Sequence, residues 1–392
     1  MTERGYGMLE KVAILGSTGS IGTSTLAVIK EHPEQFEVVA LAAGNNAKLM
    51  IQQVKEFQPR LVSMATREAA EAVKREVGDE VRVLWGDEGL KEVASSPDST
   101  YLVSALVGSK GLVPTLEAIR AGKKIGLANK ETLVTAGHIV TAEAKKHQVP
   151  LLPIDSEHSA LFQCLHGERM DDVERVIITA SGGAFRDWSR EELVNATVEQ
   201  ALNHPNWAMG NKITIDSATM MNKGFEVIEA HWLFDFPYEK IDVVLHPQSV
   251  IHSMVEFQDG AVMAQLGTPD MRVPIQYALT YPKRMQLTTK RLDFVQLSRL
   301  DFKAMDFKRY PCLKMAYDAG KAGGTVPAVL NAANEVAVQT FLQGKCTFLA
   351  IEEIIERTLD AHQAVSNPSL EEIEEADRWA RQFAQDGLVP SA

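Results

Sequence analysis

The sequence has little cysteine and no long uncharged apolar run. Its three cysteines, Cys164, Cys312 and Cys346, show neither zinc-ligand spacing nor a disulfide framework, so buried, reduced thiols are expected. No stretch approaches the roughly 18 apolar residues that a membrane-spanning helix needs. Residues 1–10 lack the apolar centre of a secretory signal, and we interpret them as a short extension before the first strand. These absences predict a cytoplasmic protein without a membrane partner.

Positive charge is also scarce, with 40 Lys and Arg against 52 Asp and Glu and a net charge of -12. A nucleic-acid partner is therefore not expected, because binding a phosphate backbone needs a concentrated basic surface. An anionic small molecule would need locally placed donors instead. The length of 392 residues and a hydrophobic content of 45% are typical of a globular enzyme with two or three domains.

Short apolar runs alternate with helical patterns from Lys11 to about Ile154, which predicts a Rossmann-like parallel sheet. The predicted strands are 11–15, 36–43, 60–65, 81–85, 101–107, 123–128 and 149–154. Helices are predicted over 113–120 and 132–146 as crossover connections between strands.

The pattern changes after residue 154. Strands are predicted over 173–180, 212–217, 242–257 and 261–267, with a turn at Asp259-Gly260, followed by a poorly periodic stretch and a helix-rich end. The prediction is an α/β protein with an N-terminal domain over 1–154, a central α+β domain over 155–285, a linker over 286–311 and a C-terminal helical bundle over 312–392.

A glycine turn follows the first predicted strand and opens a helix: Gly16-Ser17-Thr18-Gly19-Ser20-Ile21-Gly22. Small residues let the backbone approach a pyrophosphate, and the helix N-terminus offers amide donors. The spacing is GxxGxxG rather than GxGxxG, so a tight turn without a ligand is the alternative. After the next strand, Gly44, Asn45 and Asn46 stand where NAD-binding domains place a carboxylate, which favours NADP.

Two carboxylates, Asp155 and Glu157, follow the last strand of this sheet. In extended backbone they would point to the same side, and such hard oxygen ligands suit Mg²⁺ or Mn²⁺. The alternative is that they cap a following helix that begins at Ser159.

A second polar cluster lies in residues 216–229, between the predicted strand 212–217 and an amphipathic helix. Asn222, Glu226 and Glu229 share one face of this helix, with Lys223 beside them. Asn222 and Lys223 suit a phosphate clamp, and Glu226 suits a third metal oxygen. A solvated face with an internal Asn-Glu contact is the alternative reading.

A candidate lid lies between Ser181-Gly182-Gly183 and Gly210, with boundaries at about 182–212. It contains His204, Trp207 and Met209 near its tip, between glycines that would permit closure. The alternative is that these ring side chains are structural, as lone His and Trp residues in loops usually are.

Seven blocks in the same order resemble the deoxyxylulose phosphate reductoisomerases and span nearly the whole chain. They are GSTGSIG (16–22), NKE (129–131), DSEHSA (155–160), ASGGAF (180–185), HPNWAMG (204–210), DSATMMNKGFEVIEA (216–230) and HPQSVIHSMVEFQDG (246–260). The resemblance implies an NADPH-binding domain, a central catalytic domain that forms a homodimer, and a helical C-terminal domain.

The same resemblance implies a role for each matching residue. The metal ligands would be Asp155, Glu157 and Glu226, and Lys130 would lie between them and the substrate. Substrate would also contact Ser156, Ser181, His204, Trp207, Met209, Ser217, Asn222 and Lys223. Cofactor would contact Thr18, Gly19, Ser20, Ile21, Gly44, Asn45, Asn46, Asn129, Glu131 and Gly210. Some relatives carry a basic residue at the position of Asn45.

The implied reaction is a metal-dependent rearrangement of 1-deoxy-D-xylulose 5-phosphate, followed by reduction with NADPH to 2-C-methyl-D-erythritol 4-phosphate in isoprenoid precursor biosynthesis. Mg²⁺ or Mn²⁺ would act as a Lewis acid at the substrate oxygens. Two rival hypotheses are an NADP-dependent reductase of another phosphorylated aldehyde, and a dinucleotide-sensing protein without activity. An activity that survives removal of metal would favour the first rival over the reductoisomerase. Formation of product from deoxyxylulose phosphate would exclude the second.

Overall fold

The computed structural model describes residues 9–207 and 209–387, so the predicted N-terminal extension lies almost entirely outside the described residues. The chain divides into two compact units. The first unit contains residues 9–132, 140–159 and 270–289, and the second contains 133–139, 160–269 without 208, and 290–387. Two helices, α6 (Glu131–Lys146) and α7 (Ser156–Cys164), have residues in both units.

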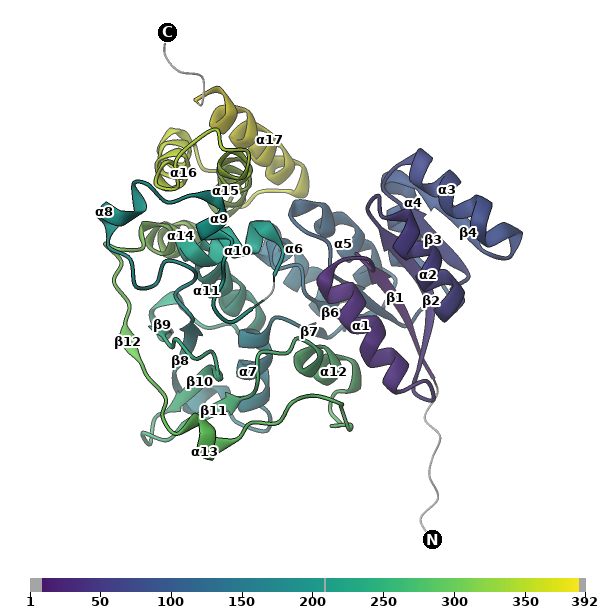
Figure 1. The fold of residues 1–392 in the computed structure, drawn as a ribbon, viewed down its shortest axis with the longest axis horizontal. Helices are drawn as coiled ribbons and strands as arrows, with labels where there is room; N and C mark the ends of the chain where they lie inside the picture. Colours follow the sequence, from purple (N-terminus) through teal and green to yellow (C-terminus); the bar gives the residue numbers. More distant parts are fainter. Residues whose placement is uncertain (1–8, 208, 388–392) are drawn as a thin grey trace. The chain divides into compact units, whose positions relative to one another are not determined.

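The first unit is built on a seven-stranded sheet in the order β4-β3-β2-β1-β5-β6-β7, in which every pair is parallel. The strands are β1 (Glu10–Leu15), β2 (Phe36–Ala43), β3 (Leu61–Met64), β4 (Arg82–Trp85), β5 (Tyr101–Ser104), β6 (Lys124–Leu127) and β7 (Leu151–Pro153). Figure 1 shows the helices of this unit beside the sheet. They are α1 (Ser20–Glu31), α2 (Ala47–Phe57), α3 (Arg67–Val77), α4 (Gly86–Ser95), α5 (Leu112–Arg120) and α12 (Arg272–Thr280).

The predicted Rossmann-like sheet is therefore confirmed, and its topology places a ligand crevice. Strand order reverses between β1 and β5, and open α/β sheets bind ligands at the carboxyl ends of such strands. The glycine turn occupies this point. Gly16 has a φ of +85°, and a Cβ there would lie 2.4 Å from the carbonyl oxygen of Ala105, just after β5. A Cβ on Gly22 would lie 2.2 Å from the Gly16 oxygen, so α1 packs directly against the turn.

Residues 270–289 pack in the first unit although they lie far along the chain. The Tyr101 hydroxyl donates to the Ala278 carbonyl oxygen at 3.0 Å, and the His32 ring lies 3.0 Å from the Gln276 side-chain oxygen. These contacts hold α12 against α1 and the strands of the parallel sheet.

The second unit contains a five-stranded sheet in the order β11-β10-β8-β9-β12. Its strands are β8 (Val173–Ala180), β9 (Ile241–Leu245), β10 (Ile251–Phe257), β11 (Val262–Leu266) and β12 (Lys303–Ala304). β8 and β9 are parallel, and the other pairs are antiparallel, as expected for a mixed sheet. The β10–β11 hairpin turns at Gly260, whose φ is +84°.

Helices cover this second sheet and form the C-terminal part of the chain. They are α8 (Arg190–Leu193), α9 (Val198–Ala201), α10 (Asn211–Thr219), α11 (Met221–Phe234), α13 (Phe294–Leu297), α14 (Pro311–Ala322), α15 (Val326–Leu342), α16 (Ala350–Ala361) and α17 (Leu370–Asp386). Phe225 and Phe341 lie in one core shared by the sheet and these helices. Figure 1 shows α15, α16 and α17 side by side, which confirms the predicted helical end. Within 9–207 and 209–387, no helix is both long and apolar enough to span a membrane.

The strand predicted over 212–217 is wrong, because these residues belong to helix α10. Ile213, Thr214 and Ile215 are β-branched and favour strands in isolation. Tertiary packing overrides that preference: Ile215 and Ala218, three positions apart, are both buried in the core. Lys212 and Asp216, four positions apart, form an ion pair of 2.9 Å along the helix.

Candidate active site

The predicted cofactor residues of the first unit lie on accessible backbone at the ends of β1 and β2. Thr18 and Ile21 are partly exposed, and Gly19, Ser20, Gly44, Asn45 and Asn46 are exposed. α1 begins without a side-chain cap or an acid in its first turn, so its N-terminus presents positive potential to a phosphate group. Asn46 has an additional role, because its side-chain oxygen accepts a hydrogen bond from Leu49 N and caps α2.

Asn129 and Glu131 lie at the junction of β6 and α6, and both are buried. The Asn129 amide donates to the carbonyl oxygens of Leu106 at 2.6 Å and Gly108 at 2.9 Å, while its oxygen accepts from Thr132 N. The Asn129 side chain therefore fastens the loop after β5 to the start of α6. Sequence reasoning missed this structural role.

Asp155 and Glu157 do not lie in extended backbone, so that part of the prediction is wrong. β7 ends at Pro153, and α7 begins at Ser156 rather than at Ser159. Asp155 accepts a hydrogen bond from Glu157 N at 3.2 Å, and the Ser156 hydroxyl donates to the Glu157 carboxylate at 2.9 Å. Asp155 thus caps the helix, as the alternative reading expected, and the cap holds it beside Ser156 and Glu157.

Lys130 forms a buried ion pair with Asp155, with 2.7 Å between Nζ and Oδ2. His158 lies on the other side of the same carboxylate, with Nδ1 3.4 Å from Oδ1. Burial raises the pKa of the Asp155 carboxyl, but the charge of Lys130 and the hydrogen bond from His158 outweigh it and hold the pKa well below its usual range. His158 was missed as a partner of Asp155. Its position three residues further along a helix was the available signal.

The second unit contains a similar pair on α11. Lys223 forms an ion pair with Glu226, and the Asn222 amide donates to the other oxygen of the same carboxylate at 2.6 Å. The side chains of Lys223 and Glu226 are only 6% and 1% exposed. The alternative of a solvated face is therefore wrong, although the internal Asn-Glu contact exists. The predicted amphipathic helix is confirmed, because Met221, Phe225 and Ile228 are buried and Trp232 is partly buried.

Ser217 is placed next to this pair by the corner between α10 and α11. Met220 has a φ of 65° and caps the end of α10, so α11 begins at Met221, four residues after Ser217. The Ser181 loop lies against the same corner, because a Cβ on Gly183 would be 2.6 Å from the Ser217 carbonyl oxygen. The structure thereby brings together the loop of Ser181, the end of α10 with Ser217, and the N-terminus of α11 with Asn222 and Lys223.

His204 faces Ser181, with 3.0 Å between Nε2 and Oγ. Its Nδ1 accepts hydrogen bonds from Asn206 N at 3.1 Å and Trp207 N at 3.0 Å. Since Nδ1 is the acceptor, Nε2 carries the proton and donates to Ser181. Burial, with a smaller contribution from the charge of Arg186, lowers the pKa of His204 to about 4.

Part of the predicted lid is firmly packed. Phe185, Leu193 and Ala201 are buried in the core, so the segment packs against the second unit at these three points. Trp207 and Met209 are partly buried, Gly210 begins α10, and Ala208 lies outside the described residues. Trp207 also lies near His252, with 6.2 Å between ring centroids.

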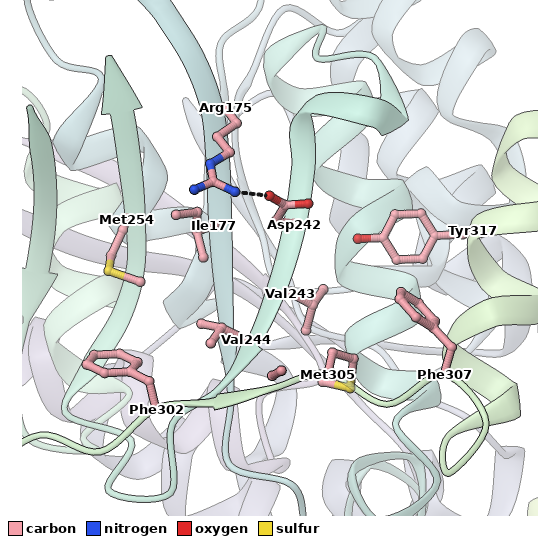
Figure 2. Close-up of a pocket in the computed structure, with 11 residues that line it drawn as sticks. Arg175, Ile177, Asp242, Val243, Val244, Met254, Phe302, Met305, Phe307 and Tyr317 are labelled. Carbon is pink, nitrogen blue, oxygen red and sulfur yellow. Dashed lines mark hydrogen bonds and ion pairs between the residues drawn. The ribbon is translucent and has the colours of Figure 1, made fainter. Parts of the chain in front are cut away.

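A cavity of about 570 Å³ in the second unit contains none of the predicted site residues. Figure 2 shows it over β8, β9 and β10, with Phe302, Met305 and Phe307 of the linker along one side. Arg175 and Asp242 form an ion pair of 2.6 Å at its rim. Its walls are mostly apolar, which does not suit a sugar phosphate.

Family models match three parts of the chain: 1-deoxy-D-xylulose 5-phosphate reductoisomerase over residues 12–137, the C-terminal domain of that enzyme over 151–234, and the DXP reductoisomerase C-terminal domain over 266–383. The 1-deoxy-D-xylulose 5-phosphate reductoisomerase of Geobacillus sp. (strain WCH70) is 60% identical over 381 residues, which cover 97% of this chain and 100% of that protein. The enzyme of the same name from Shouchella clausii is 58% identical over 96% of this chain and 100% of its own length.

This chain belongs to the 1-deoxy-D-xylulose 5-phosphate reductoisomerase family.

Solved structures agree with this family. The reductoisomerase from Zymomonas mobilis in complex with NADPH has a TM-score of 0.92 and 44% identity, over 98% of this chain and 100% of that one. A DOX-P reductoisomerase in complex with NADPH, fosmidomycin and magnesium has a TM-score of 0.93 and 42% identity, over 97% of this chain and 98% of that one. The predicted family, the α/β fold class and the function as an NADPH-dependent reductoisomerase are confirmed.

We predict that His204 stays neutral down to about pH 4. Because this pKa is below the ordinary value of 6.5, the unfolded chain takes up the proton first as the pH falls. The contribution of His204 to the free energy of unfolding is therefore present above pH 6.5 and is lost as the pH falls from 6.5 through 4. An NMR titration of the ring tests this, and a midpoint near 6.5 would contradict the buried, proton-donating geometry.

Proposed function

We propose that the chain converts 1-deoxy-D-xylulose 5-phosphate to 2-C-methyl-D-erythritol 4-phosphate with NADPH and a divalent cation, through the residues that the family resemblance assigns. The observation that carries this proposal is a pair of buried lysine-carboxylate contacts, Lys130 with Asp155 and Lys223 with Glu226. Each contact holds a charged donor and a charged acceptor out of water at a position where the resemblance expects substrate or metal. Buried charges of this kind are expensive unless they have a partner, which is typical of a functional site.

The proposed cation ligands are the three carboxylates that the family resemblance assigns, Asp155, Glu157 and Glu226. All three offer hard carboxylate oxygens, and this donor chemistry fits Mg²⁺ or Mn²⁺ better than zinc. A bound divalent cation would supply Lewis-acid stabilisation of charge on substrate oxygens. In the chain itself, Lys130 offsets the charge of Asp155, and the Asp155 cap keeps Glu157 at the start of α7.

The proposed phosphate site is the corner between α10 and α11. Ser181 and Ser217 offer hydroxyl donors, and Asn222 and Lys223 lie in the first turn of α11, where the helix dipole favours an anion. The Lys223 ammonium group would then contact the phosphate as well as the Glu226 carboxylate. Phosphate held here, away from the reacting carbons, would supply binding energy that positions the substrate.

The proposed lid residues complete the substrate site. His204 would donate from Nε2 to the substrate, while Trp207 and Met209 would exclude water, and Ser156 would contact the polar backbone of the substrate. NADPH would lie along Thr18–Ile21 and Gly44–Asn46, with further contacts from Asn129, Glu131 and Gly210. The exposed loops after β1 and β2 support this assignment, and the absence of a carboxylate at Gly44–Asn46 supports NADP.

Two further proposals follow from the sequence. The domain plan of a cofactor domain over 1–154, a catalytic domain over 155–285, a linker over 286–311 and a helical domain over 312–392 stays a proposal, as does a lid over about 182–212. A cytoplasmic location is proposed from the composition, in which three cysteines remain free and none forms a disulfide.

The test of this function is Glu226→Gln, which keeps the size of the side chain but removes its charge. We expect turnover of deoxyxylulose phosphate with Mg²⁺ to fall by roughly a hundredfold or more, because a carboxylate ligand is lost. NADPH binding, measured by fluorescence titration, should stay unchanged. The matched control is Glu353→Gln on the exposed face of α16, which should retain full activity. Full activity of Glu226→Gln would remove Glu226 from the metal site.

We also propose that the chain forms a homodimer through the second unit. Apolar side chains are unusually exposed there, with Val262 and Met263 on the edge strand β11 and Phe294, Val295, Phe302 and Phe307 on the linker. An unpaired, apolar edge strand is a template for association with another copy. Phe302 and Phe307 also line the mostly apolar cavity (Figure 2).

Met263→Lys should weaken this dimer, because it places a charge on the apolar edge of β11. The expected result in analytical ultracentrifugation is a concentration-dependent monomer fraction that the unsubstituted chain lacks. Trp85→Lys, which removes an exposed apolar side chain from the first unit, is the control and should remain dimeric. A monomeric unsubstituted chain, or a Met263→Lys variant as dimeric as the control, would contradict the assignment.

A further inference from the structure

The loop His246-Pro247-Gln248-Ser249, called the 246–249 loop below, connects β9 to β10 and is held by its own first residue. His246 is fully buried. Its Nε2 accepts hydrogen bonds from Val250 N and Ile251 N, both at 3.2 Å, so its Nδ1 carries the proton and donates to the Asp301 carbonyl oxygen at 2.9 Å. One ring therefore fixes the shape of the loop and attaches it to the linker.

The linker makes three further contacts with this loop. The Gln248 amide donates to the Asp301 carboxylate at 2.5 Å, and Asp301 N donates back to the Gln248 oxygen at 3.3 Å. Phe302 stacks on the His246 ring with 4.9 Å between centroids. Asp301 and Phe302 thus hold the 246–249 loop from one side.

The other side of the loop holds the segment that carries His204. The Asn206 amide donates to the Pro247 carbonyl oxygen at 2.7 Å and to the Ser249 hydroxyl at 2.8 Å. The backbone N–H of the same Asn206 donates to Nδ1 of His204. The residue that clamps the loop therefore also sets which nitrogen of His204 faces Ser181.

We propose that the 246–249 loop is a positioning element that orients His204 toward the substrate through Asn206, and that its own position depends on the linker through His246 and Gln248. The proposal rests on the proposed role of His204 as a substrate contact. Asn206, His246 and Gln248 are positioning residues, because each acts through another residue. The linker residue Asp301 thereby influences substrate binding without touching the lid.

The segment around His204 offers few other contacts that could replace this clamp. Pro205 is exposed, and Asn203 is exposed as well. Without the Asn206 amide, the segment loses two hydrogen bonds to the loop, and the backbone N–H groups of Asn206 and Trp207 that fix the His204 ring lose this support. A loss of one to two ordinary hydrogen bonds corresponds to roughly tenfold in affinity.

The test compares Asn206→Ala, Gln248→Ala and the double variant in NADPH oxidation with deoxyxylulose phosphate, at saturating NADPH and Mg²⁺. We expect KM to rise roughly tenfold for Asn206→Ala and less for Gln248→Ala, with kcat changed by less than KM. Because both substitutions act through one element, the double variant should match Asn206→Ala alone. Asn203→Ala, on an exposed side chain of the His204 segment, and Gln296→Ala, on an exposed side chain of the linker, are controls and should leave both constants unchanged.

Three results would overturn the proposal: an unchanged KM for Asn206→Ala, an unchanged KM for Gln248→Ala, or a double variant whose loss is the product of the single losses. Asp301→Ala removes the Asp301 carboxylate that accepts from Gln248, so it should raise KM as much as Gln248→Ala does. It replaces Gln248→Ala in the comparison if that variant does not fold. If the unsubstituted chain itself shows no turnover, the proposed function fails rather than this inference.

A second measurement separates positioning from general stability. Nitrogen-15 NMR of His204, assigned by its loss in His204→Gln, should show a protonated Nε2 and an unprotonated Nδ1 in the unsubstituted chain. Asn206→Ala should shift the ring toward a mixture of tautomers, while Asn203→Ala should not. Identical His204 spectra in all three proteins would contradict the proposed role of Asn206.

Discussion

Each of the two units contains a carboxylate that is removed from water and paired with a lysine. Asp155 meets Lys130 in the first unit, and Glu226 meets Lys223 in the second. An ionised carboxylate without a partner at such a depth would cost several kcal/mol, and the opposite charge of the lysine offsets this cost within each pair.

These charged side chains are positioned by helix termini rather than by strand ends. Asp155 caps α7 and is held there by Glu157 N, while Lys223 and Glu226 share one face of α11 three positions apart. The Asn334 amide of α15 donates to Asp216 of α10 at 2.8 Å and so joins these two helices, while Lys212 pairs with the same carboxylate within α10. Gly224 allows α14 to approach α11 closely, since a Cβ there would lie 2.4 Å from the Ala316 side chain. The chemistry of the site thus rests on how closely these helices pack.

Much of the architecture could be predicted from sequence, because buried parallel strands and amphipathic helices have distinct periods. The glycine turn was identified correctly, since Gly16 requires a positive φ and Gly22 lies against backbone. The helix at residues 212–217 was not identified, because their alternation of β-branched and polar residues resembles that of a strand. The burial of Ile215 and Ala218, which favours a helix, comes from contacts with residues far away in the sequence. Local pattern carries no information about such contacts. For the same reason sequence could not reveal the contact of Asn206 with the 246–249 loop.

The central claim is that this chain needs both a divalent cation and a specific sugar phosphate to oxidise NADPH. The most direct measurement is NADPH oxidation by the metal-stripped chain with 1-deoxy-D-xylulose 5-phosphate, first in EDTA and then with excess Mg²⁺. The account predicts no substrate-dependent oxidation in EDTA and full recovery on adding Mg²⁺, with one NADPH consumed for each methylerythritol phosphate formed. Equal oxidation in EDTA, or none with both substrate and Mg²⁺ present, would contradict it.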